Sequence, residues 1–352
     1  MLGIVCSSMP KSASHCLIFF WSRESKRLFM YDDLISIIMS VYNEPHDWLE
    51  KSIESILNQS YRNLEFIIVL DNPENSVSRN FIEKYQKKDD RIVFLVNDIN
   101  RGLAYSLNRG LEVARGEYIA RMDADDISHF DRIERQLKYI KNFNLDLMGS
   151  NVNLFNNNGI FYTTNKLQTH KYLTKILMKG TIGIVHPTFF GRKEVFKRLK
   201  GYDQFALHIE DKDFLARAIC AGFRVGNTKD VLLDCRYNTQ SVTKNNAIYI
   251  SSIGKHISKV FRECVHGKKR YDLDHDFVKN LHFSQEDIVA YNKKQRMLGD
   301  AREALTHKRY LLFADKIVRS LIHSYSAFDS IKVNLFLGWY RFLENIELRH
   351  AS

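Results

Sequence analysis

Proline and paired cysteines are scarce in this sequence. Its 352 residues include only four prolines and no stretch rich in Pro, Gly and Ser, so no flexible linker is expected between parts of the chain. The five cysteines are an odd number without a C-x-x-C pair, which argues against a disulfide framework and against a structural zinc site. Such cysteine usage is typical of cytosolic proteins.

Long apolar runs are also missing. The longest near the start, Leu17 to Trp21, is far shorter than the ~20 residues that cross a bilayer. A signal peptide would need a longer apolar region and a small-residue cleavage site. We therefore expect no transmembrane helix and a cytoplasmic location. The first periodic strand begins after Met30, and residues 1–30 are interpreted as an N-terminal extension, either disordered or not native.

Basic residues exceed acidic ones. The formal charge of +11 and the pI near 9.2 predict attraction to polyanions, which include nucleic acid, an anionic membrane leaflet and a phosphate-bearing substrate. Charge alone does not choose among these three.

The first half of the chain alternates apolar runs with amphipathic helical patterns. Four near-continuous apolar runs, at 35–41, 66–70, 92–96 and 118–122, are typical of parallel strands buried on both faces. Between them, residues 49–57 and 103–114 have apolar residues at helical spacing, and Gly116 is expected to end the second helix. This alternation predicts a doubly wound α/β sheet.

The pattern changes after Asp146. Strands are expected at 147–155, 160–164, 184–190 and 231–235, with a helix around 214–221. Residues 245–352 are rich in Lys, Arg and aromatics and predict helices, for example Phe313, Ile317, Leu321 and Tyr325 on one face. We predict a Rossmann-like domain at 31–244 and a basic helical C-terminal subdomain at 245–352.

Polar residues directly after the first four strands are the candidates for a site, because open parallel sheets bind ligands beyond the carboxyl ends of their strands. They are Tyr42-Asn43-Glu44, Asp71-Asn72, Asn97 with Asn100, and Asp123-Ala124-Asp125-Asp126. Each set taken alone is also ordinary turn chemistry.

The acidic cluster at 123–126 is the most informative of these. Three carboxylates within four residues repel one another unless a cation neutralises them, and hard oxygen ligands suit Mg²⁺ or Mn²⁺. The alternative is a helix start, with Asp126 or Ser128 capping the helix that carries Ile133. We expect Asp123 and Asp125 to be the metal ligands.

These motifs together resemble a family-2 glycosyltransferase with the GT-A fold. The similarity rests on Val-Tyr-Asn-Glu at 41–44, Asn-Arg-Gly-Leu-Ala-Tyr-Ser-Leu-Asn-Arg-Gly at 100–110, and Ala-Arg-Gly-Glu-Tyr-Ile-Ala-Arg-Met-Asp-Ala-Asp-Asp at 114–126. It runs from about Leu34 to about Tyr237. It implies a GT-A sheet that is doubly wound and mixed, and an inverting, non-processive transferase that acts in bacterial surface-glycan assembly.

The resemblance also implies roles on the donor side. The residues that it assigns to the nucleotide-sugar are Tyr42, Glu44, Asp71, Arg101, Asp123 and Asp125, with Asp71 at the uracil ring. The family has two consecutive acids followed by Gly-Ser where this chain has Asp71-Asn72-Pro73. This difference affects which nucleotide base the resemblance predicts. Arg132 and Gln136 match a family pair, although a solvated helix face is an alternative for Gln136.

A second acidic cluster, Glu210-Asp211-Lys212-Asp213, precedes an apolar helix. An inverting transfer needs a carboxylate base for the acceptor hydroxyl, and the resemblance places Asp211 in that role. Glu210 and His186 are expected on the acceptor side, where His186 only positions other groups. The alternative reading, a helix cap, suits Asp213 better.

The expected partners follow from the resemblance. They are a nucleotide-sugar donor, UDP-linked, and a saccharide or lipid-linked saccharide acceptor. The basic tail suggests peripheral contact with the anionic inner membrane leaflet, through Lys308, Arg309, Lys316, Arg319 and Lys332 interleaved with Leu311, Leu312, Phe313, Phe336, Trp339, Tyr340 and Phe342.

Three other functions are compatible with parts of the sequence. A nucleic-acid- or membrane-binding protein with an inactive transferase-like domain is the main alternative, although acids rather than bases line the predicted cleft, so no nucleic acid is expected. A nucleotidyltransferase would carry a Gly-rich phosphate loop after the first strand, which is missing here. An inactive relative is disfavoured by the intact Asp125 and Asp211.

Overall fold

The computed structural model describes residues 32–237, 246–293, 295 and 337–348. Residues 1–33 and 34–352 form separate units, and everything described below belongs to the second. The predicted extension at 1–30 and the predicted helix face at Phe313 to Tyr325 lie outside the described residues, as do the tail residues from Lys308 to Phe336.

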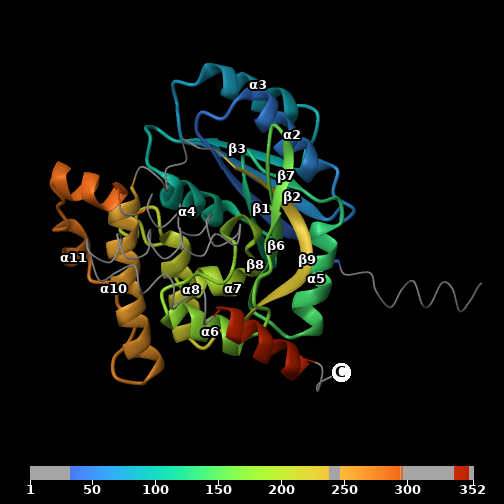
Figure 1. Ribbon diagram of the computed structural model, residues 1–352. Coiled ribbons are helices and arrows are strands. Elements are labelled where there is room, and N and C mark those ends of the chain that lie inside the picture. Colours follow the sequence, from blue (N-terminus) through green and yellow to red (C-terminus); the bar gives the residue numbers. More distant parts are fainter. Residues whose placement is uncertain (1–31, 238–245, 294, 296–336, 349–352) are drawn as a thin grey trace, which may run out of the picture. The chain divides into compact units, whose positions relative to one another are not determined.

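A parallel half-sheet forms the first part of the fold (Figure 1). Its strands are β1 (Ile35–Val41), β2 (Leu64–Leu70), β3 (Ile92–Val96) and β4 (Tyr118–Asp123), in the spatial order β3-β2-β1-β4. Almost every residue of β1, β2 and β4 is buried, as expected for strands covered on both faces. The four predicted strands are confirmed.

The helices of this half are α2 (His46–Leu57), α3 (Ser76–Gln86), α4 (Leu103–Val113) and α5 (Arg132–Asn142). The helical pattern before Gly116 is confirmed, but the expected end is wrong. Helix α4 ends at Val113, and its C-cap is Ala114. Gly116 is instead packed against β1, where an added Cβ would lie 2.6 Å from the Leu34 carbonyl oxygen and from the Ser36 nitrogen.

The second part of the sheet is mixed. Strand β4 pairs antiparallel with β8 (Phe190–Arg192), which pairs with β6 (Leu147–Asn156). Strand β6 also pairs with β7 (Gly159–Thr163) and with the long β9 (Val225–Arg236), and β9 pairs with the short β5 (Ile127–Ser128). The expected strands at 147–155, 160–164 and 231–235 are confirmed.

The strand expected at 184–190 is wrong over most of its length. Residues His186–Thr188 form the 3-10 turn η1, and only Phe190 begins β8. Pro187 has no backbone N–H to give to a ladder, and the Thr188 hydroxyl donates to the Val185 carbonyl at 2.6 Å, which closes the turn.

The remaining helices are α6 (His170–Met178), α7 (Lys193–Arg198), α8 (Glu210–Cys220), α10 (Ala247–Val265) and α11 (His275–Lys279), with further helical residues at 285–293 and 337–348. The described part of 245–352 is thus helical, as expected. Helix α10 buries Ile253, Ile257 and Phe261 in the same apolar cluster that contains Phe214 of α8. The boundary at 244/245 stays a prediction.

No helix in the described ranges has both the length and the apolar character needed to cross a membrane.

The contact between α4 and β1 gives a test of the packing. An added Cβ on Gly110 would lie 2.5 Å from Ile38 Cγ2 in the centre of the sheet. We expect Gly110→Ala to lower the free energy of unfolding by about 1–3 kcal/mol through overpacking. Urea unfolding followed by circular dichroism measures this. Gly338→Ala is the control, because an added Cβ there meets nothing within 4 Å. Equal stabilities of the two variants would contradict this packing.

Candidate active site

The acidic cluster lies in the turn between β4 and β5. Carboxylate oxygens of Asp123, Asp125 and Asp126 lie within 4.8 Å of one another. The turn is held from below by Ser52 of α2, whose hydroxyl donates to the Asp123 carbonyl at 2.9 Å. The structure therefore brings the three predicted acids together at the carboxyl end of β4.

A buried cation, Arg121, lies beneath these acids. Only 4% of Arg121 is exposed, and its guanidinium forms an ion pair with the Asp123 carboxylate. Its Nε and Nη1 atoms are buried without a hydrogen-bond partner among the described residues. The sequence motif contained Arg121 but gave it no role. Its position two residues before Asp123, on the same face of a buried strand, was the available signal.

Asp125 and Asp126 differ in their surroundings. Burial, with the charges of Asp123 and Glu44 adding to it, raises the pKa of Asp125 to about 7. Asp126 is buried and accepts the Arg236 backbone N–H at 2.8 Å. It does not cap a helix, and neither does Ser128, which belongs to β5. Helix α5 has Asp131 at its N-cap, so the capping alternative is wrong.

The donor set fits a hard divalent cation. Asp123 is shared with Arg121 and Asp126 is tied to the backbone of β9, which leaves the partly exposed Asp125 as the most available ligand. The raised pKa of Asp125 shows that the negative charge of its ionised form is not balanced by nearby positive charge. A bound cation would balance it. Asp125 and Asp123 are the residues that would hold Mg²⁺ or Mn²⁺.

Arg132 and Gln136 lie under the site and not on a solvated face. Both are fully buried. Arg132 donates to the carbonyls of Arg121 at 2.6 Å and Pro187 at 2.9 Å, and Gln136 donates to the Thr188 carbonyl at 2.8 Å. The pair ties β4 to the turn η1. The solvated alternative for Gln136 is therefore wrong.

Tyr42 and Glu44 lie in the turn after β1. Tyr42 is 45% exposed, which leaves its ring free to pack on a ligand. The Glu44 carboxylate accepts the Tyr42 backbone N–H at 2.8 Å, and burial raises the pKa of Glu44. Because the charge of Asp123 adds to this rise, Glu44 belongs electrostatically to the acidic cluster.

Asp71 is buried at the end of β2, and both its oxygens are occupied. It accepts hydrogen bonds from Asn97 Nδ2 at 2.6 Å, from the Arg101 N–H at 2.8 Å and from the Gly102 N–H at 2.7 Å. These bonds fix the start of α4, where Gly102 has a positive φ of 86°. The Arg101 guanidinium pairs with Asp98 at 2.7 Å. The contacts of Asp71 and Arg101 with a nucleotide stay predictions.

The second acidic cluster begins α8. Glu210 and Asp211 are its first residues, where the helix dipole favours negative charge. Burial raises the pKa of both acids, that of Glu210 to about 7, and the charge of Arg121 lowers both. Asp213 is no cap, because it lies inside the helix and pairs with Arg217 at 2.7 Å.

His186 is buried between the two acidic clusters. Its Nε2 lies 3.1 Å from the Tyr202 hydroxyl and its Nδ1 lies 4.0 Å from Glu210 Oε1. Burial, with Arg121 nearby, holds the pKa of His186 well below its usual range, so the ring is neutral. A neutral imidazole bonded to a tyrosine agrees with the positioning role expected for it.

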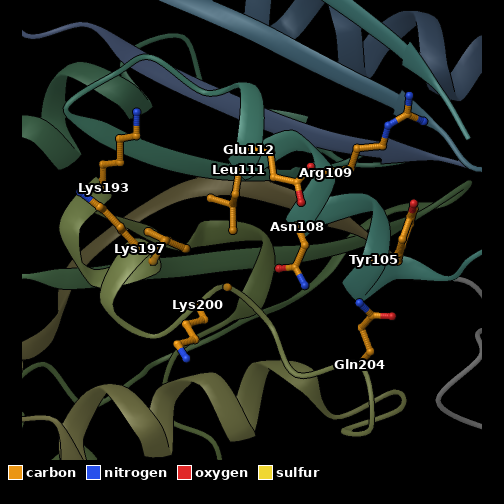
Figure 2. A pocket seen from close by; sticks show the side chains of 11 residues that line it. Tyr105, Asn108, Arg109, Leu111, Glu112, Lys193, Lys197, Lys200 and Gln204 are labelled. Atoms are coloured by element: carbon orange, nitrogen blue, oxygen red, sulfur yellow. The ribbon is translucent and has the colours of Figure 1, made fainter.

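A separate pocket of about 370 Å³ opens between α4 and α7 and contains none of the predicted site residues (Figure 2). Arg109 and Lys193 on its wall are engaged with backbone carbonyls, at Val96 and Ala114. Lys197 and Lys200 are exposed. The carboxylates described above therefore lie outside this cavity.

Comparison with known proteins identifies the family. The Glycosyl transferase family 2 profile matches residues 36–200. A glycosyltransferase of Methanocaldococcus jannaschii described as uncharacterized is 38% identical over 225 residues, 63% of this chain and 75% of that protein. The chain belongs to glycosyltransferase family 2.

Two relatives from Escherichia coli have more specific names. The O-antigen biosynthesis glycosyltransferase WbnJ is 31% identical over 62% of this chain and 85% of its own length. The UDP-Glc:alpha-D-GlcNAc-diphosphoundecaprenol beta-1,3-glucosyltransferase WfgD is 34% identical over 41% of this chain and 56% of its own length. The chain is thus a glycosyltransferase related to enzymes of cell-surface glycan assembly.

Solved structures confirm the GT-A fold. Staphylococcus aureus TarS in complex with UDP has a TM-score of 0.54 at 16% identity, over 90% of this chain and 92% of that one. The mannosyltransferase PcManGT from Pyrobaculum calidifontis, in complex with GDP-Man and Mn²⁺, has a TM-score of 0.51 at 15% identity, over 96% and 93%. At such identities the likeness concerns the fold.

The charge of Arg121, which acts on both Glu210 and Asp211, predicts how sugar transfer depends on pH. Protonation of Glu210 or Asp211 removes a carboxylate from the site, so transfer should fall as the pH drops through about 7. Arg121→Gln removes the charge that lowers both pKa values, and the acidic limb should move upward by roughly one to two pH units. The pH dependence of kcat/KM measures the limb. Arg121→Lys should restore part of the shift, and an unmoved limb in Arg121→Gln would contradict the coupling.

Proposed function

We propose that this protein is an inverting glycosyltransferase that moves a sugar from a UDP-sugar to a lipid-linked saccharide during cell-surface polysaccharide assembly. One observation carries the proposal. The acids expected for the donor, Asp123 and Asp125, and those expected for the acceptor, Glu210 and Asp211, lie within the electrostatic reach of a single buried Arg121. Asp125 and Glu210 are 85 residues apart in the sequence, and their common neighbour Arg121 supports the proposal that the two acidic clusters form one site.

The two acidic clusters have different roles in the proposed reaction. On the acceptor side the partly exposed Asp211 takes the proton of the acceptor hydroxyl, so that its oxygen attacks the anomeric carbon opposite the leaving diphosphate. The rise of its pKa on burial makes it a stronger base than a solvated aspartate. On the donor side, a divalent ion on Asp125 and Asp123 would neutralise charge on the diphosphate.

The donor base is proposed to be uracil. TarS binds UDP and UDP-GlcNAc, and PcManGT binds GDP-Man with Mn²⁺, so the fold accepts either nucleotide. The name of WfgD, a relative by sequence, gives a UDP donor. The exposed Tyr42 ring and the Asp71-Asn72 turn, where Asn72 Nδ2 donates to Asn43 at 2.7 Å, are proposed to flank the base.

The acceptor is proposed to be lipid-linked. The names of WbnJ and WfgD place both in O-antigen or diphosphoundecaprenol-linked glycan synthesis. Such an acceptor is anchored in a membrane, so the enzyme must work at its surface. We place the protein in the cytoplasm, in peripheral contact with the inner leaflet.

The membrane contact has a candidate surface on the helix 337–348. Trp339 and Phe342 are 56% and 55% exposed and stack at 5.7 Å, and Ile346 continues the same face. Aromatic rings exposed on a basic protein are typical of binding at a membrane interface. Trp339 and Phe342 belong to the tail residues that the sequence suggested for this role, whereas Tyr340, suggested with them, packs on Tyr172 at 5.8 Å between ring centroids. A protein that binds membranes but lacks activity is the alternative function.

The first experiment tests the donor site. Calorimetric titration with UDP should show binding that depends on Mn²⁺ and that is lost in Asp125→Asn. Asp131→Asn is the matched control, because the Asp131 side chain is 45% exposed and forms an ion pair with Arg135 at 3.4 Å, away from the acidic cluster. Metal-independent binding, or equal binding by Asp125→Asn, would refute the metal role of Asp125.

A second variant separates binding from chemistry. Asp211→Asn keeps the size of the side chain but removes the base, so UDP binding should persist while kcat falls by about 10²–10⁴-fold. The rate is measured by single-turnover transfer from UDP-sugar. A β-linked product from an α-linked donor is expected, and retention of configuration would refute an inverting base.

The membrane surface is tested by co-sedimentation. The Trp339→Ala/Phe342→Ala double variant should bind vesicles of phosphatidylglycerol at least several-fold more weakly than the wild type, because aromatic rings supply the apolar contact. Phe143→Ala is the control, because Phe143 is also 55% exposed but lies after α5. Undiminished binding by the double variant would exclude this surface.

A further inference from the structure

A buried lysine, Lys212, follows directly after the proposed base Asp211 at the start of α8. Only 5% of Lys212 is exposed. Its Nζ donates to the Gly254 carbonyl of α10 at 2.6 Å and to the Gly180 carbonyl, just after α6, at 3.0 Å. Three segments of the chain therefore meet at one ammonium group, and one of these segments carries the base.

The ammonium group is costly to hold in this place. Burial lowers the pKa of Lys212 to about 8, while the charge of Asp211 raises it and the charge of Arg262 lowers it further. The side chain therefore stays charged at pH 7. An apolar side chain of similar volume would avoid the cost of a buried charge, so packing alone does not account for a lysine here.

Helix α10 approaches α8 closely at Gly254 (Figure 1). An added Cβ on Gly254 would lie 2.9 Å from Ile209 Cδ1 and 3.3 Å from Lys212 Nζ. The Gly254 carbonyl also accepts from the Ser258 hydroxyl of its own helix at 2.9 Å. The absence of a side chain at position 254 thus leaves room for the lysine to reach this carbonyl.

A second contact holds the same end of α8 to the chain that follows α10. The Tyr271 hydroxyl donates to Asp213 Oδ1 at 2.8 Å, and the Arg217 Nε donates to Asp213 Oδ2 at 2.7 Å. Asp213 is completely buried. Lys212 and Asp213 are therefore both held by residues that follow the family profile, which ends at residue 200.

The backbone of Lys212 connects this anchor with the Asp211 carboxylate. The Lys212 N–H donates to Asp211 Oδ1 at 2.7 Å. Because the Lys212 side chain is held at its far end, its N–H has a fixed position, and the carboxylate that accepts from it has a fixed orientation. Asp211 Oδ2 accepts no hydrogen bond from the described part of the chain, and it can take a proton from the acceptor hydroxyl.

We propose that Lys212 is a positioning residue for the acceptor-side base, and that it fixes the Asp211 carboxylate relative to α6 and α10. The inference rests on the proposed function and extends the site to residues that do not contact substrate. One oxygen of Asp211 is held by the Lys212 N–H while the other receives the proton. Helix α10, which lies beyond the family profile, is then part of the machinery of transfer.

The first test is single-turnover transfer at pH 7 by Lys212→Met, which keeps the length of the side chain and removes both carbonyl bonds. The donor is UDP-glucose, and the acceptor is N-acetylglucosamine on an alkyl diphosphate. We expect the rate to fall by roughly tenfold to hundredfold, the effect of a misplaced catalytic group, while Mn²⁺-dependent UDP binding persists.

Lys193→Met is the matched control. Lys193 Nζ also donates to a backbone carbonyl, that of Ala114, and it lines the pocket that contains none of the predicted site residues. This variant should keep the wild-type rate. Equal rates of Lys212→Met and Lys193→Met would overturn the positioning role.

A substitution in α10 tests the same contact without changing Lys212 or any acid. Gly254→Leu places a side chain where Ile209 and the ammonium lie, so it should slow transfer in the same direction as Lys212→Met. Gly338→Leu is its control, because an added Cβ there meets nothing within 4 Å. A Gly254→Leu enzyme as fast as Gly338→Leu would contradict the link between α10 and the base.

A double variant separates positioning from a general loss of stability. If Lys212 acts through Asp211, Asp211→Asn/Lys212→Met should be no slower than Asp211→Asn alone. Losses that add in the double variant would overturn the proposal. A wild-type rate in Asp211→Asn would refute the proposed base and, with it, this role of Lys212. A slow Asp211→Asn beside a fully active Lys212→Met would refute the positioning role alone and leave the proposed base intact.

The ionisation of Asp211 gives a measurement that needs no substrate. Burial raises the pKa of Asp211, whereas the hydrogen bond from the Lys212 N–H and the charges of Arg121 and Lys212 lower it. In ¹³C NMR spectra of protein labelled at aspartate, the signal missing from Asp211→Asn should therefore titrate at a higher pH in Lys212→Met than in the wild type. Lys193→Met should titrate as the wild type does, and an unchanged titration in Lys212→Met would overturn the proposal.

Discussion

Crowding of negative charge at one end of a buried sheet is the constraint on which the site depends. Asp123, Asp125, Asp126, Glu44 and Glu210 share a region where burial, with the charges of neighbouring acids, raises the pKa of four of them. Coulomb repulsion in such a low-dielectric place favours the protonated acids unless cations compensate their charge. Arg121 is the buried cation that faces both clusters, and a metal on the donor side would supply the remaining charge. The site is thus incomplete electrostatically without its ligands.

Rigidity of the scaffold makes this unfavourable arrangement possible. Arg132 and Gln136 tie the Arg121 backbone to the turn at 186–188, and the same turn places His186 against Tyr202. Burial lowers the pKa of Arg132 to about 10, so it stays charged at neutral pH and keeps its bonds to carbonyl oxygens. A second cation therefore lies under the acids without neutralising them directly. Its function is to hold β4 and the acceptor-side turn in one geometry.

Sequence patterns predicted the parallel half of the fold well, because strands buried on both faces leave continuous apolar runs such as 35–41. They also found the acids at 123–126, because residues after strands must collect at one edge, whereas the resemblance to the family singled out the acids at 210–211, which begin a helix. They failed where tertiary contacts decide. The helical spacing of Gln136 is compatible with a buried face and with a solvated face. Only its hydrogen bond to the Thr188 carbonyl shows that it is buried. The effect of the Arg121 charge on Glu210 and Asp211 became visible only when distant segments met.

The residues expected at the donor and those expected at the acceptor lie in different parts of the chain, and this separation has a physical reason. The family profile spans 36–200 and contains every residue expected on the donor, whereas Glu210 and Asp211 follow it. A nucleotide diphosphate is the same chemical group in every enzyme that uses it, so the strand ends that hold it can keep one pattern. Acceptors differ in charge and in lipid, so a less constant part of the chain is expected to recognise them. Helix 337–348 is held through Glu344 on backbone N–H groups of Gln168 and Thr169, a contact that places few demands on the side chains of the catalytic core. Its remaining positions can therefore vary without disturbing the acids that are proposed to carry the chemistry.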